Sequence, residues 1–258
     1  MAIVAIIPAR FGSTRLPGKP LLDIAGKPMI AHVHDRARLA RLPDRVLVAT
    51  DDPRIAAAVR GFGGEVVMTS PTHTTGTDRV AEALRGIDAD IIVNVQGDEP
   101  MLDPSGIDEA ASVLLKEPAL AMSTLAVPLL DPKEMLSPGV VKVVVDAAGD
   151  ALYFSRSPIP YLRLVGGQDP KAAAEEACRR GLVLKHVGLY AYRRQSLLAL
   201  SSLPPAPLEE AEGLEQLRAL HHRIPIRVVA SLSCGGPSVD THADWERVRS
   251  LFAMNEAT

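Results

Sequence analysis

The sequence predicts an α/β fold with a doubly wound, mostly parallel sheet and an elaborated second half. Two observations carry this prediction. Within about the first hundred residues, four short apolar runs alternate with segments of helical periodicity, which is typical of a parallel sheet covered by helices on both faces. Beyond residue 135 the spacing changes, and two short apolar runs joined by a turn predict a β-hairpin.

The four strands predicted in the first half are runs of mostly apolar, β-branched residues, as expected of strands buried on both faces. They cover residues 2–7, 45–50, 65–68 and 91–95. Helices are predicted between them, one opened by Pro28, one from the Asp52–Pro53 cap to Gly61, and one from Asp78 to Leu84.

The second half is predicted to begin with a hairpin of residues 140–145 and 151–154. Further strands are expected at 185–192 and 226–232, and helices at 209–222 and 241–254. Thr241 with Asp244 three residues on forms a capping-box pattern for the last helix. Because no repeat or long linker divides the chain, we expect a single domain of residues 1–258.

Composition argues against several classes of partner. The net charge is −3 and aromatic residues make up 3% of the chain, so the basic excess and stacking aromatics typical of nucleic-acid binders are missing. No apolar stretch has the roughly 18 residues that a membrane span requires, and the first apolar run lacks a preceding basic segment. Cys178 and Cys234 have no disulfide or zinc spacing. We therefore expect a cytoplasmic protein without nucleic-acid or membrane partners.

The loop after the first strand, residues 8–20, combines cations, hydroxyls and glycines. Glycine lets backbone amides approach a ligand, and amides with nearby cations form an anion site. Ligands in open α/β sheets bind at the carboxyl ends of strands, where this loop is expected. Its spacing matches neither the Walker A loop nor the dinucleotide fingerprint. The polar residues of the loop are Arg10, Ser13, Thr14, Arg15 and Lys19.

Two aspartates follow predicted strands. Asp98 lies in the segment N-V-Q-G-D-E-P, and Asp240 lies between the last strand and the last helix. A carboxylate at a strand end can hold a Mg²⁺ ion that bridges phosphate oxygens. For Asp240, helix capping is an equally good interpretation of the residues alone. Residues 73–79 precede a helix, where amides and hydroxyls suit an anion or a base edge.

The loop wording P-A-R-x-x-S-T-R-L-P-G-K-P-L resembles the nucleotide-binding loop of sugar nucleotidyltransferases, most closely that of the CMP-Kdo synthetase (3-deoxy-manno-octulosonate cytidylyltransferase) family. The resemblance extends over nearly the whole chain, through V-N-V-Q-G-D-E-P, V-D-T, Y-F-S-R, K-H-x-G-x-Y and L-E-Q-L-R. The family motif H-x-S-G-T-E-R differs here at two positions, where Thr75 replaces the serine and Asp78 replaces the glutamate. The resemblance implies a Rossmann-like fold of the nucleotide-diphospho-sugar transferase type. It also implies transfer of CMP from CTP to the anomeric hydroxyl of Kdo, with Mg²⁺ as cofactor.

The resemblance also implies a role for each matching residue. Arg10, Lys19 and Asp98 are implied to be catalytic, and Asp98 with Asp240 to hold the metal. The residues implied to bind CTP are Ala9, Arg10, Ser13, Arg15, Lys19, His73, Thr75, Gly76, Thr77, Arg79 and Gln96. The residues implied to bind the sugar acid are Arg156, on its carboxylate, and His186, Tyr190, Glu215 and Gln216. From the residues alone, a core histidine and a solvated Glu-rich helix remain alternatives for His186 and Glu215.

The same resemblance divides the expected domain by role. About residues 1–135 are implied to bind the nucleotide, about 136–230 the sugar and a second copy of the chain, and 231–258 to complete the metal site. Small-molecule partners CTP and Kdo and a homodimer are therefore expected. Three alternatives stay open: a cytidylyltransferase for another sugar acid such as sialic acid, a non-catalytic nucleotide sensor, and a glycosyltransferase. A glycosyltransferase would be expected to carry a D-x-D metal motif after a strand. The D-x-D of this chain, Asp88 to Asp90, precedes a strand and therefore lies at the wrong end of it for a metal site.

Overall fold

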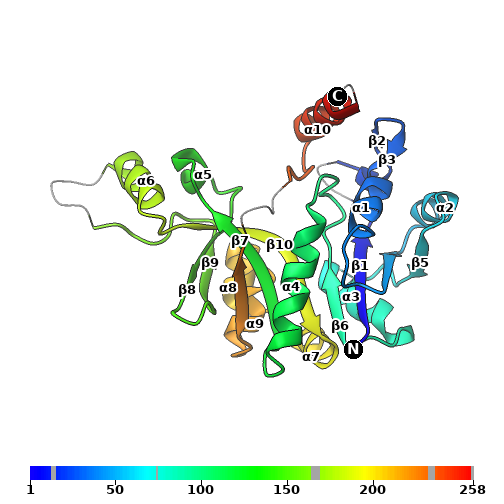
Figure 1. The fold of residues 1–258 in the computed structure, drawn as a ribbon, viewed down its shortest axis with the longest axis horizontal. Coiled ribbons are helices and arrows are strands. Elements are labelled where there is room, and N and C mark those ends of the chain that lie inside the picture. Colours follow the sequence, from blue (N-terminus) through cyan, green and yellow to red (C-terminus); the bar gives the residue numbers. More distant parts are fainter. Residues whose placement is uncertain (13–15, 74, 164–168, 232–235, 257–258) are drawn as a thin grey trace.

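The computed structural model describes residues 1–12, 16–73, 75–163, 169–231 and 236–256. One sheet crosses the molecule in the order β11–β7–β10–β6–β1–β4–β5, with helices on both faces (Figure 1). In this row only β10 runs against the others, paired antiparallel with β6 and β7. The strands are β1 Ile3–Ala9, β4 Arg45–Thr50, β5 Glu65–Met68, β6 Ile91–Asn94, β7 Met122–Pro128, β10 Leu184–Arg193 and β11 Ile226–Ala230. The predicted doubly wound, mostly parallel sheet is confirmed.

The central strand β1 contributes side chains to two cores, because successive residues of a strand point to opposite faces. Val4 and Ile6 belong to the core covered by α3, α7 and α9. Ile3, Ala5 and Ile7 belong to the core under α1, α2 and α4. This burial on both faces explains the continuous apolar runs in the sequence. The helices are α1 Met29–Ala37, α2 Pro53–Gly61, α3 Gly76–Ala83, α4 Pro104–Lys116, α7 Arg194–Ser202 and α9 Leu217–His221.

Two of the predicted helix starts, those of α2 and α10, have the predicted caps. Asp52 Oδ1 accepts the backbone N–H of Arg54 at 2.8 Å and so caps α2. At the start of α10 (His242–Glu256), Thr241 and Asp244 form the predicted capping box: Thr241 Oγ1 accepts the N–H of Asp244, and the Asp244 carboxylate accepts the N–H of Thr241.

The predicted single helix over residues 209–222 is wrong. Instead, α8 (Pro207–Glu212) ends at Gly213, whose φ of 61° lies in the left-handed region that favours glycine. α9 begins four residues later. A buried ion pair joins the two helices, with Arg218 Nη2 2.6 Å from Glu209 Oε1. Glu209 is therefore part of the core.

Residues 96–139 carried no strand or helix prediction, yet they form α4, β7 and α5. The predicted hairpin β8–β9 extends the sheet by pairing with the start of β10, and with the helices α5 and α6 it forms a projecting unit (Figure 1). Its own small core contains Leu129, Met135, Ala177 and Val183. The elements of this unit are α5 Pro132–Leu136, β8 Lys142–Val145, β9 Ala151–Ser155 and α6 Pro170–Arg179.

The C-terminal helix α10 packs beside the short β2–β3 ribbon, Asp23–Ile24 and Lys27–Pro28, above the carboxyl end of β1 (Figure 1). Trp245 Nε1 donates to the Asp23 carbonyl at 2.9 Å, and Val248 is buried against Ile24. This packing places the turn before α10, which carries Asp240, next to the loop after β1. Within the described residues, no helix is long and apolar enough to cross a membrane.

Candidate functional site

The site lies at the carboxyl ends of β1 and β6, which are neighbouring parallel strands. The chain leaving β6 continues into Gln96, Gly97 and Asp98. The turn before α10 joins it there, because the Val239 N–H donates to the Asp98 carbonyl at 2.9 Å. Three segments that are far apart in the sequence are thus held at one edge of the sheet.

Lys19 and the two predicted metal ligands form one cluster. Lys19 Nζ lies 2.7 Å from Asp98 Oδ2 and 3.2 Å from Asp240 Oδ1. Lys19 begins a short 3₁₀ turn, and the preceding Gly18 has φ 69°, a conformation that favours glycine. The lysine side chain is 14% exposed, whereas Asp240 is 40% exposed. The cluster therefore opens on one side to a ligand.

The donor set of this cluster fits a divalent cation. Two carboxylate oxygens already share one positive charge, the Lys19 ammonium. Among the described residues, no group of three or more His, Cys, Asp and Glu side chains surrounds a common point. Mg²⁺ is commonly held by one or two carboxylates together with substrate phosphates and water, so two aspartates are sufficient.

Glu99 is a further member of this region that the sequence reasoning missed. Burial raises the pKa of Glu99 to about 8, and the neighbouring charges of Asp98 and Asp240 act in the same direction. Its position directly after Asp98 in G-D-E-P was a usable signal, because adjacent carboxylates at a strand end repel each other and raise one another's pKa.

The predicted nucleotide loop leads into α3 beside this cluster. Thr75 caps the helix, its Oγ1 accepting the Asp78 N–H at 3.1 Å. The amino end of α3 approaches β1 closely, since a Cβ on Gly76 would lie 3.4 Å from Pro8 Cγ. His73 pairs through Nε2 with the Glu82 carboxylate, which also accepts the Ser70 N–H. The loop is thus anchored to its own helix.

Three of the residues predicted to bind the nucleotide do not line either of the two cavities that border the carboxylate cluster. Arg79 is buried, with Nη1 2.6 Å from Thr69 Oγ1 and 3.3 Å from Asp51 Oδ1, so it joins β5 and β4 loops to α3. Ala9 is buried at the end of β1, and Arg10 is exposed. Their contacts with CTP stay predictions. Ser13 and Arg15 lie outside the described residues.

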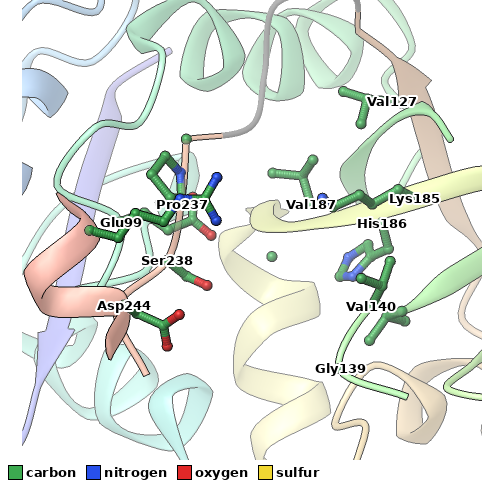
Figure 2. Close-up of a pocket in the computed structure, with 14 residues that line it drawn as sticks. Glu99, Val127, Gly139, Val140, Lys185, His186, Val187, Pro237, Ser238 and Asp244 are labelled. Carbon is green, nitrogen blue, oxygen red and sulfur yellow. The ribbon is translucent and has the colours of Figure 1, made fainter. Parts of the chain in front are cut away.

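The sugar-side predictions meet in one cavity of about 350 Å³. The predicted residues that line it are Thr77, Gln96, Asp98, Arg156, His186, Tyr190, Glu215, Gln216 and Asp240. A second cavity of about 410 Å³ adjoins it, and both are lined by Glu99, His186, Gly188 and Ser238. Figure 2 shows His186 and Val187 on one side of this second cavity and Ser238 and Asp244 on the other. The residues of the sugar side therefore lie beside the carboxylate cluster.

Two buried polar atoms of the cavity remain able to form hydrogen bonds with a ligand. Glu215 Oε1 and Gln216 Nε2 are buried and make no hydrogen bond within the described residues. Burial raises the pKa of Glu215, an effect that the Thr75 and Thr77 hydroxyls oppose. Such unsatisfied buried polar atoms are costly unless a ligand pairs with them.

Arg156 has a structural role that the sequence did not indicate. Its guanidinium donates to three backbone carbonyls, those of Glu212, Pro138 and Gly213. A guanidinium has five N–H donors, so two remain for a carboxylate. The predicted contact of Arg156 with the sugar acid stays a prediction.

Tyr192 and Lys142 were also missed. Tyr192 lines the cavity two residues after Tyr190, on the same strand, and the two rings stack with centroids 5.9 Å apart. Lys142 is fully buried, and its ammonium donates to the carbonyls of Ser137, Val140 and Arg156. A lone cation within the apolar run V-V-K-V-V-V was the sequence signal for it.

Gly97 permits the close approach of β1 to the loop that carries Asp98. A Cβ on Gly97 would lie 2.8 Å from the Pro8 carbonyl oxygen, which belongs to the backbone and cannot move aside. We expect Gly97→Ala to lower the free energy of unfolding by about 1–3 kcal/mol, the usual cost of overpacking. We also expect it to weaken CTP binding, because Asp98 would be displaced from Lys19.

Urea unfolding and titration calorimetry with CTP measure these two effects. Gly86→Ala is the matched control, since a Cβ there meets nothing within 4 Å. Equal stability and equal CTP affinity of the two variants would show that the contact with Pro8 does not position the loop.

Comparisons with known proteins identify the family of the chain. The cytidylyltransferase family model matches residues 4–226. The 3-deoxy-manno-octulosonate cytidylyltransferase of Geobacter sulfurreducens is 56% identical over 250 residues, which are 96% of this chain and 98% of the relative. The enzyme of the same name from Escherichia coli is 48% identical over 254 residues, covering 98% of this chain and 97% of the relative.

One solved structure supports the same assignment, and a second shares the fold. A CMP:2-keto-3-deoxy-manno-octonic acid synthetase complexed with CTP has a TM-score of 0.89 and 47% identity, over 99% of this chain and 100% of the other. A 4-diphosphocytidyl-2C-methyl-D-erythritol synthase from Anaerococcus prevotii, at 12% identity and a TM-score of 0.61 over 98% of both chains, shows the shared fold alone. By both its sequence and its fold, the chain belongs to the 3-deoxy-manno-octulosonate cytidylyltransferase (CMP-Kdo synthetase) family.

Proposed function

We propose that the protein transfers CMP from CTP to the anomeric hydroxyl of Kdo and releases pyrophosphate. The observation that carries the proposal is the arrangement of the site. Lys19, Asp98 and Asp240 converge within hydrogen-bond distance, directly beside a cavity in which Glu215 Oε1 and Gln216 Nε2 are buried and have no hydrogen-bond partner among the described residues. A CTP-bound relative at 47% identity supports the choice of nucleotide.

The reaction joins the anomeric oxygen of the sugar to the α-phosphorus and breaks the bond from that phosphorus to the pyrophosphate oxygen. Catalysis of such a transfer depends mainly on positioning and on stabilising charge. Lys19 Nζ supplies a fixed positive charge at the phosphates. Mg²⁺, when bound, would neutralise charge on the phosphate oxygens, and Asp98 and Asp240 are the residues that would hold it.

The residues of the cavity account for recognition of a polyhydroxylated acid. Arg156 keeps two N–H donors for the carboxylate, in the bidentate manner that guanidinium groups favour. Glu215 and Gln216 offer an acceptor and a donor to sugar hydroxyls. About residues 1–135 would then bind the nucleotide, 136–230 the sugar, and 231–258 complete the metal site.

The setting of the activity is part of the same proposal. CMP-Kdo is the activated sugar for lipopolysaccharide core synthesis, and we place the enzyme in the cytoplasm. We further propose a homodimer. Exposed apolar side chains on the projecting unit and on α8 support a contact between copies there: Leu136, Leu152, Tyr161 and Leu208.

Pyrophosphate release tests the proposal. With Mg²⁺, release is expected from CTP and Kdo, and not from ATP, GTP or UTP, nor when sialic acid replaces Kdo. Excess EDTA should stop release, and added Mg²⁺ should restore it. Release with sialic acid in place of Kdo would keep the nucleotide site and overturn the sugar assignments. CTP binding without release for any sugar acid would indicate a nucleotide sensor.

A further inference from the structure

The strand that carries His186 is interrupted by a β-bulge. In the pairing of β10 with β7, Val187 lies opposite Leu125, but the next paired residue, Tyr190, lies opposite Thr124. The two residues between, Gly188 and Leu189, have no partner in this register. Bulges of this kind redirect side chains near functional sites. Here the bulge lies where β10 borders both cavities.

The hydroxyl of Thr124 occupies the inside of this bulge. Thr124 is fully buried, and its Oγ1 lies 2.8 Å from the Leu189 carbonyl oxygen and 3.2 Å from the Val187 carbonyl oxygen. The same Oγ1 lies 3.0 Å from His186 Nε2. One hydroxyl therefore has three partners, two of which are carbonyls that can only accept.

The number of hydrogens decides how these partners are satisfied. A hydroxyl has one hydrogen, and the nearest acceptor for it is the Leu189 carbonyl. Within the described residues, the lone pairs of Oγ1 are then what is left for His186 Nε2, so Nε2 is the ring nitrogen that carries a hydrogen. If Nε2 were bare, three acceptors would compete for the one hydroxyl hydrogen and two of them would receive none, whereas with a hydrogen on Nε2 only one carbonyl is left without it.

The other ring nitrogen then has a defined chemistry. Burial lowers the pKa of His186 to about 3, so the ring is neutral and Nδ1 carries only a lone pair. The ring is held in place by Phe154 and Tyr190, with centroids 5.1 and 5.4 Å away. In Figure 2 it is turned toward the cavity, across from Ser238.

We propose that Thr124 is a positioning residue that holds His186 in the Nε2–H tautomer, so that Nδ1 presents a hydrogen-bond acceptor to a hydroxyl of the bound sugar acid. The part of this statement that concerns the sugar rests on the proposed function. The pairing of Thr124 with His186 does not. An acceptor at this position favours a ligand hydroxyl and disfavours a carboxylate oxygen, so it separates the hydroxylated side of the sugar from its acidic end.

The tautomer is measured directly by NMR of the protein labelled with ¹⁵N-histidine. The chain has 7 histidines, and the His186 signals are assigned from the spectrum of His186→Gln. In the wild type we expect Nε2 to show directly bonded hydrogen and Nδ1 to resonate as an unprotonated nitrogen. A hydrogen on Nδ1 in the free wild-type protein would overturn the proposal without any variant.

Two substitutions of Thr124 separate the hydroxyl from the shape of the side chain. Thr124→Val keeps the shape and removes the hydroxyl, and we expect a mixture of tautomers with a rise of about tenfold in KM for Kdo, the size expected for one lost hydrogen bond. KM for CTP should stay within about twofold, and Thr124→Ser should restore both the tautomer and KM. A Thr124→Val protein with unchanged tautomer and unchanged KM would contradict the proposal.

Failure of this inference is distinguishable from failure of the proposed function. If no sugar acid is turned over but His186 is found as the Nε2–H tautomer governed by Thr124, the function is wrong and the positioning role stands. If Kdo is turned over but His186 carries its hydrogen on Nδ1, the function stands and the positioning role is wrong.

Discussion

Replacing Lys19 with methionine is expected to lower turnover about 100- to 1,000-fold, the usual effect of removing one group that stabilises charge in the transition state. Methionine keeps the length and the apolar stem of the side chain but removes the ammonium. That ammonium lies 2.7 Å from Asp98 and 3.2 Å from Asp240. The measurement is pyrophosphate release at saturating CTP and Kdo, so that the loss is read in kcat.

The same variant has a second readout that depends on the carboxylates. In the structure the Lys19 ammonium neutralises part of the charge of Asp98 and Asp240. Removing it leaves more negative charge on the two carboxylates uncompensated, and we expect Lys19→Met to bind Mg²⁺ more tightly than the wild type when no nucleotide is present. Isothermal titration calorimetry measures this affinity.

Lys27→Met is the matched control for Lys19→Met. Lys27 also pairs with an aspartate, Asp35, at 3.1 Å, but both side chains are more than half exposed. Exposed ion pairs contribute little, so neither turnover nor Mg²⁺ affinity should change. Turnover within threefold of the wild type in Lys19→Met, or weaker Mg²⁺ binding than in the wild type, would contradict the role assigned to the lysine.

Replacing Arg218 with methionine is expected to lower the free energy of unfolding by about 3–5 kcal/mol, as is typical when one partner of a buried ion pair is removed. Arg218 and Glu209 are both more than 90% buried, and the guanidinium contacts both oxygens of the carboxylate. In the variant, the hydrogen bond that remains to the charged Glu209 within the described part of the chain comes from the Ala206 N–H. Urea unfolding at pH 7 measures the loss.

The pH dependence identifies the buried charge as the cause. Burial by itself raises the pKa of Glu209, but Arg218 and the Ala206 N–H outweigh it and hold the pKa below its usual value of 4.5. In the wild type this carboxylate therefore adds stability above pH 4.5, which is lost as pH falls through the lower folded pKa. In Arg218→Met burial dominates and ionising Glu209 costs stability above pH 4.5. The difference between the two proteins should thus shrink as the pH approaches 4.5.

Two further variants test the same pair. Arg218→Met combined with Glu209→Met should recover most of the lost stability, because an apolar pair of similar volume can replace a buried ion pair. Arg179→Met removes an exposed arginine paired with Glu176 and should be neutral. A loss in Arg218→Met that is equal at pH 5 and pH 7, with no recovery in the double variant, would place the cause in packing instead.

The strands of the first half could be predicted because a strand that is buried on both faces requires apolar residues at nearly every position. β1, β4 and β6 read as continuous apolar runs, and the Asp52–Pro53 cap marks the start of α2. The same cap signal, Asp103–Pro104, precedes α4 and was available in the sequence. The helix predicted at 209–222 failed because its periodicity was followed across Gly213, the residue at which the chain adopts a positive φ.

The residue types of the site were predicted through the resemblance, but several of their partners were not. Lys19, Asp98 and Asp240 meet as predicted at one edge of the sheet. Thr124 gave no signal, since a threonine in a strand is common and its role depends on a bulge in the neighbouring strand. A bulge depends on how two strands pair, and single-strand periodicity does not record it.

The sequence by itself determined the class of sheet, and it predicted an anion-binding loop after β1 and the identity of the side chains that the proposed chemistry requires. These are local properties, because apolar periodicity, glycine content and charge depend only on short stretches of the sequence. Only the tertiary structure decided which of these side chains meet. It brought Asp240 and Asp98, which are 142 positions apart in the sequence, to the same lysine, buried Glu209 against Arg218, and placed Thr124 beside His186. Such contacts depend on how strands and helices pack, because burial and distance are properties of the whole fold rather than of any single segment.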